Sequence, residues 1–216
     1  MFNFFGKKPK LVREDDKIYM YRRITDQVLV TDAIAAAQGT NLVIISSFFG
    51  ASLQRMENLL RARSFPCAVL NIHDLPALPL NGVPALFLLD ARQIVSNLSL
   101  QSWLMKPQCS FRFLFTEHYP IFSAEQQALD ILEQASQESQ QQVRFYAGLD
   151  DRLFQVFGGN NIMQLMHKMG MRDDEVITHP MVTKSIANAQ KKIEKKVTHE
   201  FTASGEEDWF QKNMPH

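Results

Sequence analysis

The chain has 216 residues, of which 45% are hydrophobic, so it can bury one substantial core and carry a smaller helical extension. Its 23 lysines and arginines balance 23 aspartates and glutamates, which removes the positive field that general nucleic-acid binding requires. Cys67 and Cys109 lie in no spacing that binds zinc. No apolar run approaches the length of a membrane span, and the start of the sequence lacks the continuous apolar centre of a signal peptide, so we expect a cytoplasmic protein. The balanced charge makes nucleic acid an unlikely partner.

Residues 1–15 are expected to form a flexible N-terminal segment. It places aromatic residues beside lysines, namely Phe2, Phe4, Phe5, Lys7 and Lys8. Such a composition could touch an anionic membrane surface peripherally, at the inner face of the membrane. A frayed terminus is the simpler interpretation, because so short a segment buries little apolar area.

From residue 16 to about residue 71 the pattern alternates between strand and helix. The predicted elements are a strand at 17–20, a helix from Thr25 or Asp26 to Ala37, a strand at 42–45, a helix at 52–63 and a strand at 67–70. The strand at 42–45 is apolar throughout, which is typical of a central parallel strand buried on both faces. These elements predict βαβ crossovers.

Two more strands are predicted at 85–89 and 111–115, with a weaker helix at 93–105 between them. Continued alternation favours an open, mostly parallel α/β sheet with helices on both faces, in a RecA-like or Rossmann-like topology. The segment 123–138 predicts an amphipathic helix, with Ser123 as N-cap and Gln126 at the capping-box position.

Isolated polar residues favour structural interpretations over chemical ones. Glu117 and His118 are adjacent on a predicted strand end, so their side chains should point apart, and we expect a loop-facing histidine. His73 and Asp74 begin a loop and have no third metal ligand in view. No segment matches GxxxxGK followed by Ser or Thr, the loop whose backbone wraps nucleotide phosphates.

The most informative stretch runs from Arg144 to Glu194. Its motifs are Arg144-Phe145-Tyr146, Leu149-Asp150-Asp151 with Phe157-Gly158 after it, Lys168-Met169-Gly170-Met171, and His179-Pro180-Met181-Val182-Thr183-Lys184 running on to Lys192. This order and spacing closely resemble the end of the second motor domain of SecA, the ATPase that drives preproteins through the Sec channel. A weaker similarity extends upstream through Ile18-Tyr19-Met20, Leu42 to Ser47 and Ala68 to Asn71.

The resemblance implies a domain organisation. Residues 16–157 correspond to a RecA-like second motor domain of the P-loop NTPase fold. Residues 158–203 form a helical extension that resembles the start of the SecA scaffold helix, with His179 and Pro180 at the structural joint. Residues 204–216 are expected to be a flexible tail.

The resemblance also implies where catalytic groups should lie. In the family the phosphate cradle belongs to the first motor domain, and the second supplies arginines upstream of Arg144. Here the segment 123–138 contains neither arginine nor glycine, and a supplied arginine is worth roughly 10³ to 10⁵ in rate. Asp90 and Arg92 are at most weak cofactor-binding remnants, and a solvated ion pair explains them equally well. We therefore expect no catalytic residue, no metal and no cofactor, with ATP and Mg²⁺ bound only where a partner completes the site.

A final helix is predicted at about 181–201, with a narrow apolar stripe between charged residues. The candidate partner-binding residues of this helix and the tail are Ile186, Ile193, Val197, Phe201, Trp209 and Phe210. Packing against the chain's own sheet is an equal alternative for the stripe, and self-association is another.

Three functions follow from these observations. The first is a SecA-like, non-catalytic accessory or regulatory module of protein export, which binds full-length SecA or another Sec component. The second is an ATPase half-site completed in trans by a chain that bears a P-loop, or a domain that binds nucleotide without hydrolysis. A helicase-like nucleic-acid-binding domain is the least favoured, because the chain has no net positive charge.

Overall fold

The computed structural model describes residues 11–39, 42–69, 86–105, 111–136, 141–178 and 180–214. The strands are β1 (Val12–Arg13), β2 (Lys17–Tyr19), β3 (Leu42–Ser47), β4 (Ala68–Val69), β5 (Leu86–Asp90), β6 (Phe111–Phe115) and β7 (Gln141–Gly148). The helices are α1 (Arg22–Ala37), α2 (Gly50–Ala62), α3 (Arg92–Ser96), α4 (Leu98–Leu104), α5 (Phe122–Ala135), α6 (Arg152–Gln155), α7 (Gly159–Lys168), α8 (Pro180–Glu194) and α9 (Glu206–Asn213).

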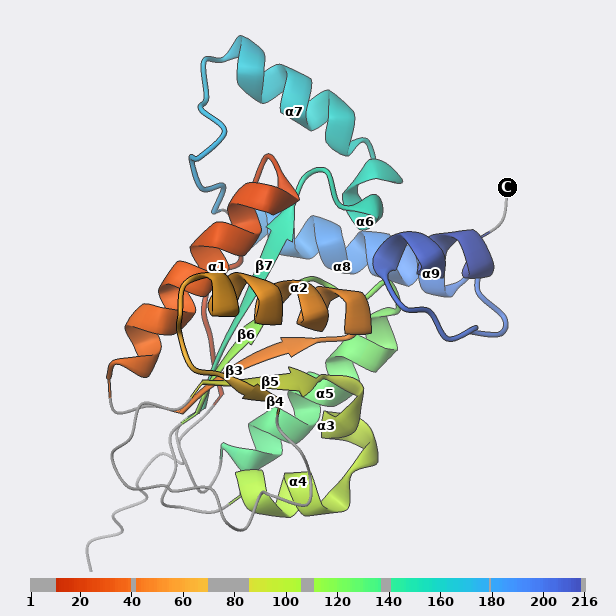
Figure 1. Cartoon of the computed structure of the whole chain (residues 1–216). Helices are drawn as coiled ribbons and strands as arrows, with labels where there is room; N and C mark the ends of the chain where they lie inside the picture. Colours follow the sequence, from red (N-terminus) through yellow and green to blue (C-terminus); the bar gives the residue numbers. More distant parts are fainter. Residues whose placement is uncertain are drawn as a thin grey trace, which may run out of the picture.

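A seven-stranded sheet forms the centre of the molecule (Figure 1). Its order is β1-β7-β6-β3-β5-β4, with β2 also pairing with β7, and all of these pairs are parallel. This sheet, with helices around it, confirms the predicted mostly parallel α/β architecture. Parallel pairing brings the carboxyl ends of β3, β6 and β7 to one edge of the sheet.

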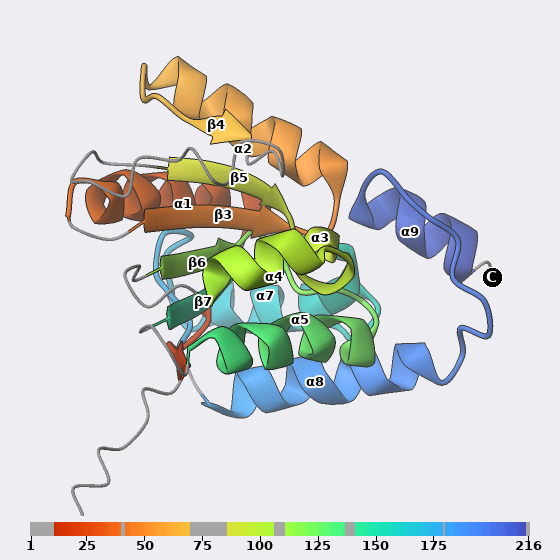
Figure 2. The ribbon, with the colours of Figure 1, turned by 90° about the horizontal axis from the view of Figure 1, so that it is seen from below.

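Alternating side chains of the central strands build a core on each face of the sheet. On one face, Val43 and Ile45 pack with residues of α1 and α2. On the other face, Ile44 belongs to a larger core that also includes residues of α3, α4, α5, α8 and α9. In Figure 2, α8 lies outside α5, farther from the sheet. The predicted helical extension therefore shares a core with the sheet domain.

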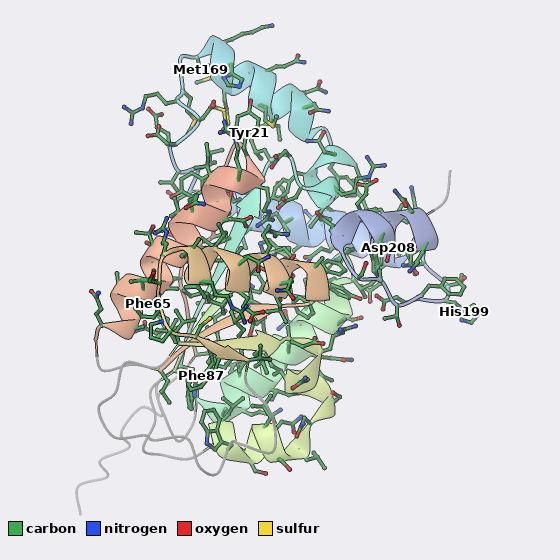
Figure 3. All side chains as sticks on the ribbon, viewed as in Figure 1. Tyr21, Phe65, Phe87, Met169, His199 and Asp208 are labelled. Carbon is green, nitrogen blue, oxygen red and sulfur yellow. The ribbon has the colours of Figure 1, made fainter. Side chains whose placement is uncertain are left out.

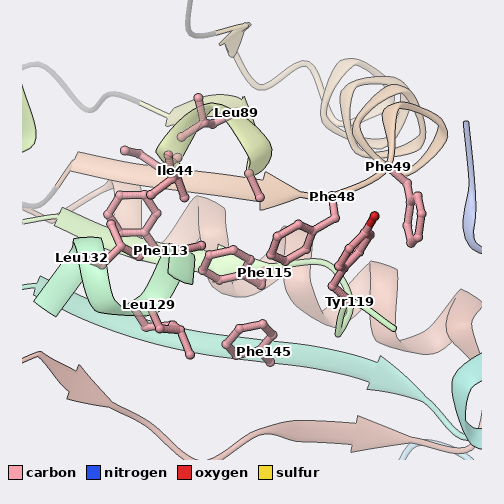
Figure 4. Packing of buried hydrophobic residues seen from close by; sticks show 14 of the residues in the cluster. Ile44, Phe48, Phe49, Leu89, Phe113, Phe115, Tyr119, Leu129, Leu132 and Phe145 are labelled. Atoms are coloured by element: carbon pink, nitrogen blue, oxygen red, sulfur yellow. The ribbon is translucent and has the colours of Figure 1, made fainter. Parts of the chain in front are cut away.

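Phenylalanines of β6 form the middle of the second core (Figure 4). Phe111, Phe113 and Phe115 occupy alternate positions of the strand, so all three point to the same face. Phe115 stacks on Phe145 of β7 with ring centroids 4.5 Å apart. The strand was predicted with the same bounds, because its aromatic run is long and clearly apolar.

The beginnings of three helices differ from prediction. Helix α1 starts at Arg22, and Thr25 lies buried inside it, where its hydroxyl donates to the Ala147 carbonyl oxygen at 3.1 Å. Helix α5 starts at Phe122, and the Ser123 hydroxyl donates to Glu194 of α8 in place of capping its own helix. The predicted helix at 93–105 is divided at Asn97, whose side chain accepts from Leu100 N and caps α4.

The C-terminal part also differs from prediction. Pro180 begins α8 as expected, but the helix ends at Glu194. The chain then turns back to the start of α2, where Ala51 N donates to the Ser204 carbonyl oxygen at 2.9 Å. Residues predicted to form a flexible tail contain α9, in which Trp209 is fully buried and Phe210 is nearly so. Burial of two large aromatic side chains stabilises this short helix against the rest of the fold. Residues 1–10, the loop with His73 and Asp74, Cys109 and His179 lie outside the described residues.

Candidate functional site at the carboxyl edge of the sheet

A cavity of about 460 Å³ lies at the carboxyl edge of the sheet. Its walls come from α1, α2, α6, α9 and the loops that follow β6 and β7. In open parallel sheets this edge is where ligands usually bind, so the residues of this carboxyl-edge cavity decide what chemistry the fold can support. Six carboxylate residues and three arginines line it, namely Glu117, Asp150, Asp151, Glu206, Glu207, Asp208, Arg22, Arg55 and Arg152.

Arg22, at the start of α1, is the most buried of these arginines. Its Nε donates to Asp151 Oδ1 at 2.7 Å, its Nη2 donates to the other carboxylate oxygen, and its Nη1 donates to the Thr116 carbonyl oxygen. Burial alone would lower the pKa of Arg22, but Asp151 and Asp26 outweigh burial and raise it above the usual value. This guanidinium is a fixed structural cation with its donors already engaged.

The remaining arginines of the cavity also face carboxylates. Arg55 Nε donates to Asp26 Oδ2 at 2.6 Å, and Arg152 Nε lies 3.8 Å from Glu207 Oε2. Of these two pairs, the one between Arg152 and Glu207 is too long for a hydrogen bond. Arg152 Nε has no hydrogen-bond partner among the described residues. Arg152 is therefore the arginine of this cavity that is least engaged.

Two aspartates that follow β7 join the sheet to α1. Asp150 Oδ1 accepts from the backbone N–H of Arg22 at 2.6 Å, at the beginning of that helix. Asp151 Oδ2 accepts from Gly148 N at 2.8 Å while the same carboxylate holds the Arg22 guanidinium. A side chain at position 148 would place Cβ 2.4 Å from Asp150 Oδ1, so only glycine fits this turn.

Helix α9 closes one side of the cavity through Glu206. The two carboxylate oxygens of Glu206 accept from Arg152 N and Leu153 N, both at 3.0 Å, so the side chain caps the start of α6. Burial raises the pKa of Glu206 to about 8, and the charge of Asp151 adds to this effect. The cap links the C-terminal helix to the loop after β7.

A buried serine–carboxylate pair lies beside the cavity, at the ends of β3 and β6. Glu117 accepts from the Ser47 hydroxyl and from Phe48 N, the latter at 3.1 Å. Ser47 is fully buried, and its hydroxyl also accepts from Phe49 N at 3.0 Å. A nucleophile needs access to substrate and an adjacent base, so this pair supports the loop geometry and not acyl transfer.

His118 is buried with Asp16 and Glu125, whereas the sequence predicted a loop-facing histidine. Its Nδ1 lies 3.1 Å from Glu125 Oε1, and its Nε2 lies 3.4 Å from Asp16 Oδ2. Thr183 of α8 donates to Asp16 and Gln190 of α8 donates to Glu125, at 2.7 and 2.8 Å. This His118 network therefore connects α8 to the sheet. The Glu117 side chain points away from that of His118, as predicted for adjacent residues, and it makes none of the contacts of the His118 network.

The predicted cofactor remnants lie apart from the carboxyl-edge cavity. Arg92 Nη2 donates to Asp90 Oδ2 at 2.6 Å and Arg92 Nε to Asp90 Oδ1 at 2.9 Å, on the surface after β5. Hydrogen bonds from Arg92 to this carboxylate raise the pKa of the guanidinium. The pair is local and partly exposed, and its role as a cofactor-binding remnant stays a prediction.

Most of the predicted partner-binding residues are covered by the chain itself. Ile186, Ile193, Trp209 and Phe210 are buried in its core, and Val197 packs partly against that core. Phe201 alone of the six predicted residues is exposed, at 62%. The stripe on α8 thus packs mainly inward, and partner binding through these residues stays a prediction.

The described residues contain no group of three or more His, Cys, Asp or Glu side chains that could hold a metal ion. None of the helices within the described ranges is long and apolar enough to cross a membrane.

No protein-family model matches the chain. SecA of Sorangium cellulosum is 53% identical over 53 residues, which are 24% of this chain and 5% of that protein. SecA of Acidithiobacillus ferrooxidans is 55% identical over 51 residues, and SecA 1 of Alkaliphilus metalliredigens is 49% identical over 51, each match covering 24% of this chain and 6% of the relative. The chain thus spans only about a twentieth of the length of these relatives.

Among solved structures, the C-terminal part of the Fun30 ATPase domain aligns with a TM-score of 0.40 and 14% identity, covering 78% of this chain and 52% of that one. The sequence relatives confirm the resemblance predicted from the motifs: about a quarter of this chain is a SecA-like stretch.

Proposed function

We propose that the chain is a non-catalytic, SecA-like accessory module of protein export, which acts in the cytoplasm by binding full-length SecA or another Sec component. The relatives that share its SecA-like stretch are subunits of the protein translocase. The proposal extends that relationship to a partner and to a regulatory mode of action.

One observation supports this proposal most strongly: the carboxyl-edge cavity is rich in acid, and its arginines face carboxylates. Within the described residues Asp150 forms no ion pair and accepts only from Arg22 N. A phosphate charge about 4 Å from such a carboxylate experiences a repulsion of about 4 kcal/mol at an effective dielectric constant of 20. The sequence offers no phosphate-binding loop to compensate. Nucleotide binding is therefore disfavoured at this edge.

The test uses the full chain in calorimetric titrations with ATP and Mg²⁺ and, separately, with full-length SecA. We expect no heat of nucleotide binding, a complex with SecA, and an altered rate of ATP hydrolysis by SecA in that complex. Hydrolysis by the isolated chain would contradict a non-catalytic function. Absence of any complex with SecA or with the other Sec components would contradict the export function.

An ATPase half-site completed in trans is the second candidate, and Arg152 is the observation that favours it. Its Nε has no hydrogen-bond partner among the described residues and lies 3.8 Å from Glu207, so a partner's nucleotide could attract it. If this candidate is correct, Arg152→Gln should lower turnover of the mixture by roughly 10³-fold or more. Arg172→Gln, at an exposed arginine outside the cavity, is the matched control.

A further inference from the structure

A second cavity, of about 210 Å³, lies between α6, α7 and α8. We call it the α7–α8 groove, and its principal lining residues are Phe157, Ile162, Met166, Val182, Ile186 and Ala189. The remaining lining residues are also apolar except for Ser185. An apolar hollow on a protein surface is a common docking place for apolar side chains of another molecule.

The groove belongs to a surface with an unusual number of exposed apolar residues. Half of the large apolar side chains exposed in the described part of the chain fall between residues 156 and 176, namely Val156, Phe157, Ile162, Leu165, Met169 and Val176. Helix α7 stands away from the sheet in Figure 1, and Met169 at its end projects outward in Figure 3. Clustered apolar exposure of this kind marks interaction sites more often than isolated exposed residues do.

The surface beside the groove at the C-terminal end of α8 is strongly basic. A neighbouring cavity of about 350 Å³ shares Phe157 with the groove and is lined by Lys192, Lys195 and Lys196 together with Ile193. It contains no acidic lining residue. Within the ranges that the structure describes, none of these three lysines takes part in an ion pair. Their charge is therefore available to a ligand.

The two hollows are neighbours that share Phe157, and together they follow α8 and the turn after it. Ile186, Ala189 and Ile193 follow one another at helical spacing beneath them, and Ile186 and Ile193 lie about 10 Å apart along the axis, two helical turns. A partner helix with apolar residues at positions i, i+3 or i+4, and i+7 presents side chains over the same length. Acidic residues at one end of that helix would face the lysines.

We infer that the α7–α8 groove and its lysines bind an acidic, amphipathic helix of a partner protein. The inference rests on the proposed function only in requiring a protein partner. Charge complementarity selects this occupant. The chain's own N-terminal residues are a poorer fit, because Lys7, Lys8 and Lys10 would meet lysines. A bilayer surface, which is convex or flat, matches a concave groove less well than a helix does.

The probe is a fluorescent synthetic peptide of about 14 residues, roughly four helical turns, with leucines on one face and glutamates elsewhere. A second peptide carries lysine at every glutamate position. Fluorescence anisotropy with the full chain should detect binding of the acidic peptide and none of the basic one. Binding should weaken as NaCl rises to about 0.5 M, where charges are strongly screened.

Two sets of variants locate the binding. Lys192→Glu with Lys195→Glu should weaken binding of the acidic peptide roughly tenfold or more, while Lys184→Glu, at an exposed position of the same helix outside both cavities, should not. Ile162→Glu should weaken it similarly, with Leu98→Glu as the control at an exposed leucine elsewhere. The lysine variants lie on the surface, so they test the inference even where Ile162→Glu alters folding.

Several results would overturn the inference: equal binding of both peptides, no binding of the acidic one, or lysine variants that bind as well as the wild type. Binding to phosphatidylserine vesicles that depends on the same lysines, with no peptide binding, would assign the surface to a membrane and also overturn it. Titration with full-length SecA separates the two proposals. Peptide binding without any Sec partner would support the groove as a binding site and contradict the export function. A SecA complex that these variants do not change would support the export function and contradict binding through the groove.

Discussion

Replacement of His118 by glutamine should test the network that attaches α8 to the sheet. The imidazole is buried between Glu125 and Asp16, at 3.1 and 3.4 Å, and stacks on Phe145 with ring centroids 4.5 Å apart. Glutamine keeps part of the volume and a hydrogen-bond donor but removes the positive charge. Two buried carboxylates would then lose the cation between them.

The magnitude follows from the burial of these groups. Burial alone would lower the pKa of His118, but the charges of Glu125 and Asp16 outweigh it and raise the pKa to about 10. Removal of one partner from a buried ion pair typically costs about 3–5 kcal/mol, because the remaining charge stays desolvated. Arg13, 3.6 Å from Asp16, can relieve part of this loss, so we expect about 3 kcal/mol at neutral pH.

The same pKa sets the direction of the pH dependence. The ordinary pKa of histidine is 6.5, so between pH 6.5 and about 10 the folded chain holds a proton that the unfolded chain has released. The stability due to protonated His118 is complete below pH 6.5 and is lost as pH rises towards 10. The free energy of unfolding of the wild type should therefore decrease over this window, and that of His118→Gln should decrease less.

Urea unfolding followed by tryptophan fluorescence measures both effects, because Trp103 and Trp209 are buried. His199→Gln, at an exposed histidine in the loop before α9, is the matched control. A loss smaller than about 1 kcal/mol at neutral pH, or an unchanged pH dependence, would refute the electrostatic role of His118.

Three further perturbations address the carboxyl edge. The pKa of Glu206 is raised to about 8 from an ordinary 4.5, so the stability of the fold decreases as pH rises through this interval. The melting temperature should therefore differ less between pH values below and above this interval for Glu206→Gln than for the wild type. Trp209→Ala should destabilise the fold by about 3–5 kcal/mol in urea unfolding, because the side chain is fully buried, whereas exposed Phe201→Ala should change it little. Gly148→Ala should lower the free energy of unfolding by about 1–3 kcal/mol in the same assay, because the added Cβ would lie 2.7 Å from Arg22 N. Gly170→Ser tests backbone strain separately, because a Cβ at Gly170 meets open space but the residue has a φ of +79°.

Local patterns were sufficient to predict most of the sheet. Continuous apolar runs predicted β3, β5 and β6 closely, because strands buried on both faces need apolar residues at every position. Helix starts were less predictable. Arg22 begins α1 because Asp150, far along the chain, accepts its backbone N–H, and no residue next to the helix signals this contact.

Long-range contacts also explain why the C-terminal part was predicted poorly. The apolar spacing of α8 continues through Val197 and Phe201, so periodicity alone extends the helix beyond its observed end at Glu194. The chain instead turns back, and Glu200 accepts from Trp209 Nε1 at 2.7 Å and from the Tyr119 hydroxyl. Likewise, burial of Glu125 in the His118 network could not be inferred from its position in an amphipathic helix.

The Asp150–Asp151 pair clarifies what the SecA-like motifs do in this fold. Both residues belong to the quoted resemblance, and both are engaged inside the chain: Asp150 with the start of α1, Asp151 with the Arg22 guanidinium and Gly148 N. Neither interaction needs a nucleotide, and each fixes the loop between β7 and α6. Since α6 is in turn capped by Glu206 of α9, these residues set the position of α6 beside the α7–α8 groove. Disruption of the Arg22–Asp151 pair should therefore weaken peptide binding at the groove without direct contact, a coupling that Asp151→Asn would reveal by fluorescence anisotropy and that an unchanged affinity would disprove.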